Sequence, residues 1–169
     1  MSATHHTSDP RIGWGAAPGP GDGSAPLPRH RRDGIMPTTA AALSVRGTTF
    51  TCAAGKAAAP PEHHPLVQDF LDTLTTERRE RHTGRCPEAV LLTRYLTSAE
   101  AGRSKRAARK PFTPGDARRA LKNAKITTRR IREQGDPQHG TYAPPCRSCA
   151  ALLDYFGVHA VAPASGEER

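Results

Sequence analysis

Aromatic residues are scarce in this sequence, with four Phe, three Tyr and one Trp among 169 residues, and the hydrophobic fraction is 36%. The chain is long enough for one domain plus a tail, and its core must rely on Leu, Val and Ala. There is no internal repeat and no heptad pattern, which excludes solenoids and coiled coils.

Long hydrophobic runs are also missing. No apolar run resembles a signal peptide, and none is long enough to span a membrane. Cysteine is limited to four residues. We therefore expect a cytoplasmic protein with reduced thiols, and secretion by a specialised route stays open as an alternative.

Acidic residues are outnumbered, with 16 Asp and Glu against 25 Lys and Arg, which gives a net charge of +9. The excess is concentrated between Gly102 and Arg132, where 12 basic residues face a single acid, Asp116. Such a local excess favours polyanionic partners such as nucleic acid. A solvated, Arg-rich surface would explain the same composition equally well.

The ends of the chain differ in composition from its middle. Residues 1–36 are rich in Gly, Pro, Ser and His and carry almost no apolar pattern. They cannot bury enough surface to offset chain entropy, which predicts a disordered tail. The sequence thus predicts an ordered domain over residues 37–162 and a short C-terminal tail over residues 163–169.

Predicted strands and helices alternate within the ordered part. The apolar spacing, prolines and glycines predict strands at 41–45, 48–52, 125–132 and 158–161, and helices at 65–84, 87–102, 117–124 and 147–156. Residues 125–132 have the propensity for either state, and we choose a strand partly because the metal site described next favours one. This order predicts an α/β layered fold, with a sheet covered by helices.

Two short segments carry the most specific signal. Cys86-Pro87-Glu88 is followed, 60 residues after the first cysteine, by Cys146 and Cys149, with Pro145 before them. A zinc ion with three protein ligands keeps a fourth position open for water, which is the catalytic arrangement. Both segments begin predicted helices, where free amides and the macrodipole stabilise thiolates. The spacing therefore predicts Cys86, Cys146 and Cys149 as zinc ligands.

Glu88 lies two residues after the first predicted ligand, in the first turn of a helix. It can reach past the metal without binding it, and so serve as the proton shuttle. A first ligand, a Glu two residues later and a distant Pro-Cys-x-x-Cys are typical of zinc-dependent nucleobase deaminases, in which Cys can replace His as first ligand.

A four-cysteine structural zinc site is the main alternative, and it would recruit Cys52. A lone strand cysteine is more often a small core residue, so we leave Cys52 out of the predicted ligand set. His63 and His64 precede a predicted helix, where they would line a pocket or cap that helix. The other histidines of the predicted domain have no spacing relation to the cysteines.

These motifs resemble the YwqJ-type branch of the cytidine deaminase-like superfamily. The resemblance rests on residues 84–89, 144–153 and 156–158 and extends over about residues 38–162. It implies a three-layer cytidine deaminase-like fold, a mixed sheet covered by helices, with zinc between two helix N-termini. It also implies the same site residues, with Cys86, Cys146 and Cys149 as ligands and Glu88 as proton shuttle. Many relatives are predicted toxin domains of bacterial conflict systems, each with a dedicated immunity protein.

The predicted function is a Zn²⁺-dependent hydrolytic deaminase that acts on a nucleobase in a nucleotide or in single-stranded nucleic acid, with a toxin-related role and an immunity protein as partner. The basic stretch favours the polymer. The alternative is a nucleic-acid-binding or partner-binding protein with a structural zinc and no catalysis. No residue pattern identifies the base, the substrate contacts or the oligomeric state.

Overall fold

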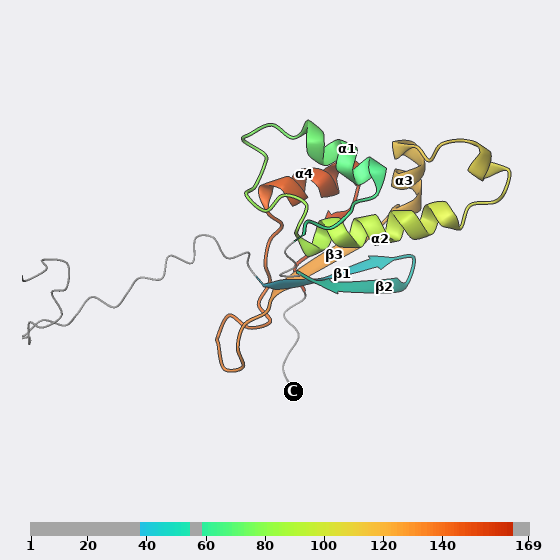
Figure 1. Cartoon of the computed structure of the whole chain (residues 1–169). Helices are drawn as coiled ribbons and strands as arrows, with labels where there is room; N and C mark the ends of the chain where they lie inside the picture. Colours follow the sequence, from blue (N-terminus) through green and yellow to red (C-terminus); the bar gives the residue numbers. More distant parts are fainter. Residues whose placement is uncertain (1–37, 55–58, 164–169) are drawn as a thin grey trace, which may run out of the picture. The chain divides into compact units, whose positions relative to one another are not determined.

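A mixed four-stranded sheet forms one side of the domain (Figure 1). The computed structural model describes residues 38–54 and 59–163. The strands lie in the order β2-β1-β3-β4 and span Thr48–Ala53, Thr39–Val45, Lys125–Arg130 and His159–Ala160. Strand β1 pairs antiparallel with both β2 and β3, whereas β3 pairs parallel with β4. The parallel pair requires a crossover, which α4 supplies.

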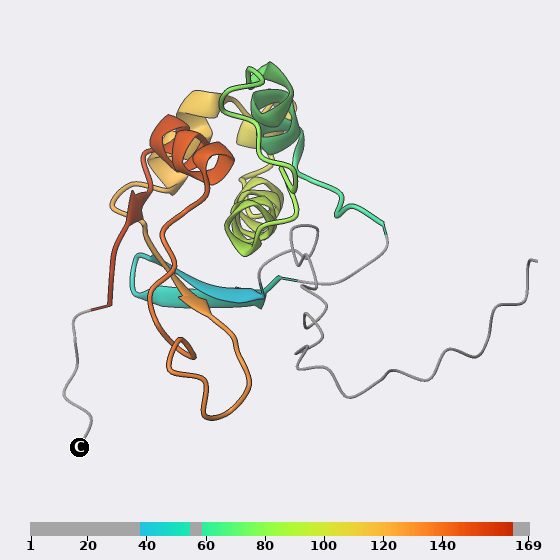
Figure 2. The same ribbon diagram turned by 90° about the vertical axis from the view of Figure 1, so that its left-hand side faces the viewer.

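Helices cover one face of this sheet (Figure 2). They are α1 (Pro65–Thr73), α2 (Pro87–Ala101), the 3₁₀ turn η1 (Ala107–Arg109), α3 (Pro114–Ala120) and α4 (Arg147–Phe156). The expected α/β class and the mixed sheet are confirmed. Among the described residues, no helix has both the length and the apolar character needed to cross a membrane.

The core lies between the sheet and these helices. Alternation along β1 buries Ala41, Leu43 and Val45, while the residues between them are only half-buried. Leu43 lies opposite Ile126 of β3, and both side chains are fully buried. Helix α2 closes the core from above with a buried apolar side, formed by Leu91, Leu92 and Leu96.

Two of the expected helices have different bounds in the structure. Helix α1 ends at Thr73, not near Gly84 as predicted. Residues 75–84 contain no apolar side chain that a longer helix could bury. Helix α3 begins at Pro114, earlier than predicted, because Thr113 and Asp116 form a capping box around its first turn.

The ambiguous segment after α3 is a strand, as predicted, although β3 ends at Arg130. The chain then loops out and returns beside β3, where the amide of Arg130 donates to the carbonyl of Thr141 and the amide of Ala143 donates to the carbonyl of Thr128. This return brings the segment before Cys146 next to the sheet. The tail expected over residues 1–36 lies outside the described residues, as does most of the tail expected over residues 163–169.

Candidate functional site

Three cysteines meet where the N-termini of α2 and α4 lie close together. Cys86 is the N-cap residue of α2, Cys146 is the N-cap residue of α4, and Cys149 is buried in the first turn of α4. Their Sγ atoms all lie within 4.8 Å of one another, and those of Cys86 and Cys146 are 3.6 Å apart. Tetrahedral Zn–S bonds of about 2.3 Å would place two sulfurs roughly 3.8 Å apart. The three cysteines could therefore bind a zinc ion.

Cys52 does not belong to this cluster. It lies on β2 and lines a separate cavity of about 190 Å³ together with Val90 and Arg94. Within the described part of the chain, the cluster thus has three members and lacks the fourth ligand that a closed structural zinc site requires.

Hydrogen bonds couple the three thiols and make Cys146 the most acidic of them. Hydrogen bonds from Cys149 and Cys86 lower the pKa of Cys146 to about 3. Cys86 and Cys149 each share a hydrogen bond with Cys146, and these bonds raise the pKa of both thiols. A divalent cation would replace the remaining thiol protons, because metals bind the thiolate form.

Glu88 is the buried carboxylate beside this cluster. It is 4% exposed, and its Oε1 accepts a hydrogen bond from the hydroxyl of Thr128 at 3.0 Å. Burial raises the pKa of Glu88 above its usual value, and the negative charge on Cys146 raises it further. A buried carboxyl group with a raised pKa holds a proton more readily than an exposed one, which suits proton transfer.

A cavity of about 220 Å³ joins these groups. Its lining comes from two helix starts, from β1 and β3, and from the returning segment: Thr38, Thr39, Cys86, Glu88, Thr128, Arg130, Arg132, Ala143, Pro144 and Cys146. Cys86, Cys146 and Glu88 therefore border one space. A small molecule in this cavity would contact the cysteines and the carboxylate together.

Ser148, between the two cysteines of α4, fixes the loop that leads to Cys86. Its hydroxyl is fully buried, accepts from the amide of Glu80 at 2.8 Å and donates to the carbonyl of Arg78 at 2.9 Å. Arg147 adds an ion pair with Glu80 at 2.8 Å. These bonds tie the loop after α1 to the start of α4, so they position Cys86 relative to Cys146.

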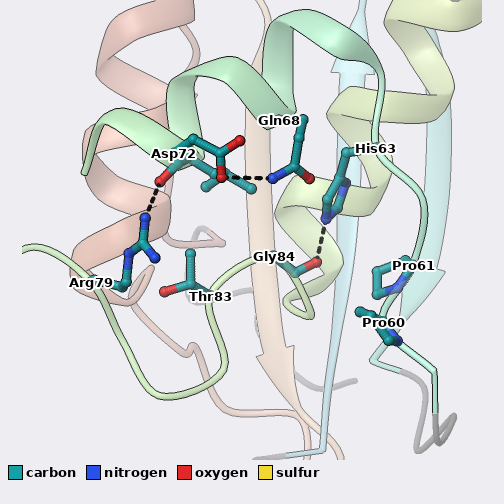
Figure 3. A pocket seen from close by; sticks show the side chains of 9 residues that line it. Pro60, Pro61, His63, Gln68, Asp72, Arg79, Thr83 and Gly84 are labelled. Atoms are coloured by element: carbon teal, nitrogen blue, oxygen red, sulfur yellow. Dashed lines mark hydrogen bonds between the residues drawn. The ribbon is translucent and has the colours of Figure 1, made fainter.

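His63 holds the same loop from its other side (Figure 3). Its Nε2 donates to the carbonyl of Gly84 at 2.8 Å, and its Nδ1 accepts from the hydroxyl of Thr93 at 2.9 Å. Burial lowers the pKa of His63, so the ring is neutral, as this bonding requires. Gly84 has φ +83°, and a Cβ there would lie 2.9 Å from Nε2 of His63. His64 instead caps α1 by accepting from the amide of Leu66.

The Ser148 bonds give a testable expectation. Ser148→Ala removes both of these part-buried hydrogen bonds, each of which contributes about 0.5–1.5 kcal/mol. We expect the free energy of unfolding to fall by about 1–3 kcal/mol in urea denaturation. Zinc affinity should fall as well, because the loop before Cys86 loses its attachment to α4.

Ser98→Ala is the matched control, because Ser98 is exposed on α2 and its side chain makes no hydrogen bond within the described residues. Its stability should change by less than about 0.5 kcal/mol. Equal stability and zinc affinity in the Ser148 and Ser98 variants would contradict a positioning role for Ser148.

The structure brings Cys86, Glu88, Cys146 and Cys149 together, and their roles stay predictions. The sequence analysis did not single out Thr128, Arg130 and Ser148, which also contact this region. A signal for the first two was present. Side chains alternate along a strand, so an inward Ile126 also directs Thr128 and Arg130 inward. Ser148 had no comparable signal, because its partners lie on a loop that was predicted to be helical.

The basic stretch that favoured a polymer substrate is divided in the structure. The part from Arg103 to Lys122 begins beyond the C-terminus of α2, on the loop that carries η1 and on α3 (Figure 1). Cys86 lies at the N-terminus of α2, and the 15 residues of α2 span about 22 Å. Of the 12 basic residues in this stretch, Arg130 and Arg132 line the cavity beside the cysteines.

An α/β domain that brings three thiols and a buried carboxylate to two helix N-termini has the donor set of the metal-dependent nucleobase deaminases. The model of the YwqJ-like deaminase family matches residues 23–158, which is well over half of the chain, and the chain belongs to this family. The resemblance noted from the motifs is confirmed, and membership supports a hydrolytic deaminase activity. No curated protein and no solved structure matches the chain.

Proposed function

We propose that this protein is a zinc-dependent hydrolytic deaminase that acts on a nucleobase in a nucleotide or in single-stranded nucleic acid. One observation carries the proposal: a single cavity is bordered by two of the three clustered thiols and by the buried carboxylate of Glu88. The family assignment supports deamination independently of this geometry.

Cys86, Cys146 and Cys149 would hold the ion. When bound there, zinc supplies a water whose pKa is lowered towards neutrality. Glu88 accepts a proton from the attacking water and delivers it to the ring nitrogen of the base. The carboxylate then takes the second proton of the attacking oxygen and transfers it to the departing amine. The exocyclic amino group leaves as ammonia, and a carbonyl oxygen takes its place.

Thr128 is a positioning residue for this proton transfer, because its hydroxyl donates to Oε1 of Glu88 and fixes one carboxylate oxygen. Thr128→Val keeps the shape and removes the hydroxyl. A hydrogen bond to a charged group contributes about 1.5–3 kcal/mol, so we expect kcat to fall roughly 10- to 100-fold in steady-state assays.

Thr128→Ser is the rescue control, since serine keeps the donor and loses one methyl group. Its kcat should stay close to that of the wild type, with zinc content unchanged in both variants. A valine variant with wild-type kcat would show that this hydrogen bond has no part in catalysis.

The test of the proposed function is mass spectrometry of zinc-loaded full-length protein with nucleosides, nucleotides and single-stranded oligonucleotides. The expected product has one amino group replaced by oxygen. Inactivity across the whole panel would refute catalysis and favour a binding protein with a structural metal. The toxin-related role, the immunity protein and the cytoplasmic location stay predictions.

A further inference from the structure

Two arginines border the cavity on the side of β3. Arg130 follows Thr128 by two residues and therefore shares its face of the sheet. Arg132 lies beyond the end of the strand and also lines the cavity. Glu88 is the one carboxylate among the lining residues, and the arginines place two positive charges on the β3 side of the cavity.

The two guanidinium groups differ in how they are held. NH1 of Arg130 donates to the carbonyl of Tyr142 at 2.6 Å and to the hydroxyl of Thr141 at 3.2 Å. Among the described residues, Nε and NH2 of Arg130 have no partner, and neither has the side chain of Arg132. One arginine is thus fixed by the returning segment with donors to spare, and the other is exposed and adaptable.

The size of the cavity limits which part of a substrate it encloses. Its volume of about 220 Å³ is below the roughly 300–1,000 Å³ of pockets that enclose a whole drug-sized ligand. A base can enter towards Cys86 and Glu88, while the sugar and its phosphate extend to the rim.

We propose that Arg130 and Arg132 form a phosphate subsite, so that this site selects a phosphorylated nucleobase over the free base or nucleoside. This inference rests on the proposed function for the presence of a nucleobase in the cavity, and it adds the residues that recognise the phosphate. Arginine donates from a planar fork that matches two phosphate oxygens, and its charge persists at every physiological pH. The phosphate can be the monoester of a free nucleotide or the diester of a strand.

Binding to zinc-loaded full-length Glu88→Gln protein tests the proposal without requiring turnover. The probes are cytidine, adenosine and guanosine, their 5′-monophosphates, and single-stranded oligonucleotides, measured by calorimetry at fixed salt. We expect at least one phosphorylated probe to bind more tightly than its nucleoside. Arg132→Gln should weaken that binding about 10- to 100-fold, as expected for loss of a charge-assisted contact.

Arg129→Gln is the matched control, because it removes the same charge from the neighbouring position on β3. Arg129 is exposed and faces the other side of the sheet. Its binding should equal that of the parent protein. Equal losses in the Arg129 and Arg132 variants, or equal affinity for nucleoside and nucleotide, would overturn the subsite. Arg132-dependent binding of nucleotides supports the subsite even if no product forms. The absence of product would refute only the proposed catalysis.

A preference between the two phosphate sources is read from the same titrations. Tight binding of monophosphates indicates a free nucleotide as ligand, whereas Arg132-dependent binding of oligonucleotides alone indicates a strand. Both outcomes support the subsite. If no probe binds with any dependence on Arg132, the inference is wrong, whatever the activity assay shows.

Discussion

Glu88→Gln is expected to lower kcat by about 10²- to 10⁴-fold, which is the usual contribution of a positioned general acid–base group. The amide has the same shape and can still accept the hydroxyl of Thr128, but it cannot exchange a proton. Zinc content should stay at the wild-type level, because Glu88 is not a member of the cysteine cluster. Mass spectrometry of the products and metal analysis of the same sample provide the two measurements.

Stability separates this role from a structural one. In zinc-depleted protein, burial raises the pKa of Glu88, so its ionised form destabilises the folded state at neutral pH relative to the neutral form. Glu88→Gln removes that ionisation, so the free energy of unfolding should remain equal or increase. An unfolded or metal-free variant would contradict this prediction, and full activity would exclude Glu88 as the proton shuttle.

Cys149→Ser is expected to remove the bound zinc and, with it, the activity. Cys149 is 1% exposed, and its sulfur lies within 4.8 Å of both partners, so a serine hydroxyl would replace one of three soft ligands. Zinc that binds only the folded state stabilises it by about 4 kcal/mol at 1,000 times its Kd. The wild type should therefore lose roughly 8–16 °C in melting temperature when a chelator is added.

Cys52→Ser is the matched control, because Cys52 lies on β2 outside the cluster. It should keep its zinc and show the same response to the chelator as the wild type. In Cys149→Ser the chelator should change nothing. Zinc loss from the Cys52 variant would instead support a four-cysteine structural site and weaken the case for catalysis.

The position of the candidate site was predictable because its signals are local. Pro87 and Pro145 mark the starts of two helices, and a cysteine at each start gains stabilisation from free amides. The spacing of Cys146 and Cys149 places both sulfurs on one helical turn, and Glu88 follows Cys86 on another. These relations depend on a few consecutive residues, so no tertiary contact is needed to see them.

Helix ends without such local signals were harder to predict. Residues 75–84 continue the polar pattern of a helix surface, yet α1 ends at Thr73. The loop is stabilised by the side chains of Ser148 and His63, which are distant in sequence. Helix propensity alone therefore gave a helix that was too long.

The sequence by itself determined the three thiols, the carboxylate and the helix starts that carry them, because each follows from short-range spacing and backbone chemistry. Only the tertiary structure decided that Thr128 bonds to Glu88, that Arg130 and Arg132 line the same cavity, and that the rest of the basic stretch lies elsewhere. The physical reason is that strand pairing and the return of the chain beside β3 bring together groups separated by about 40 residues.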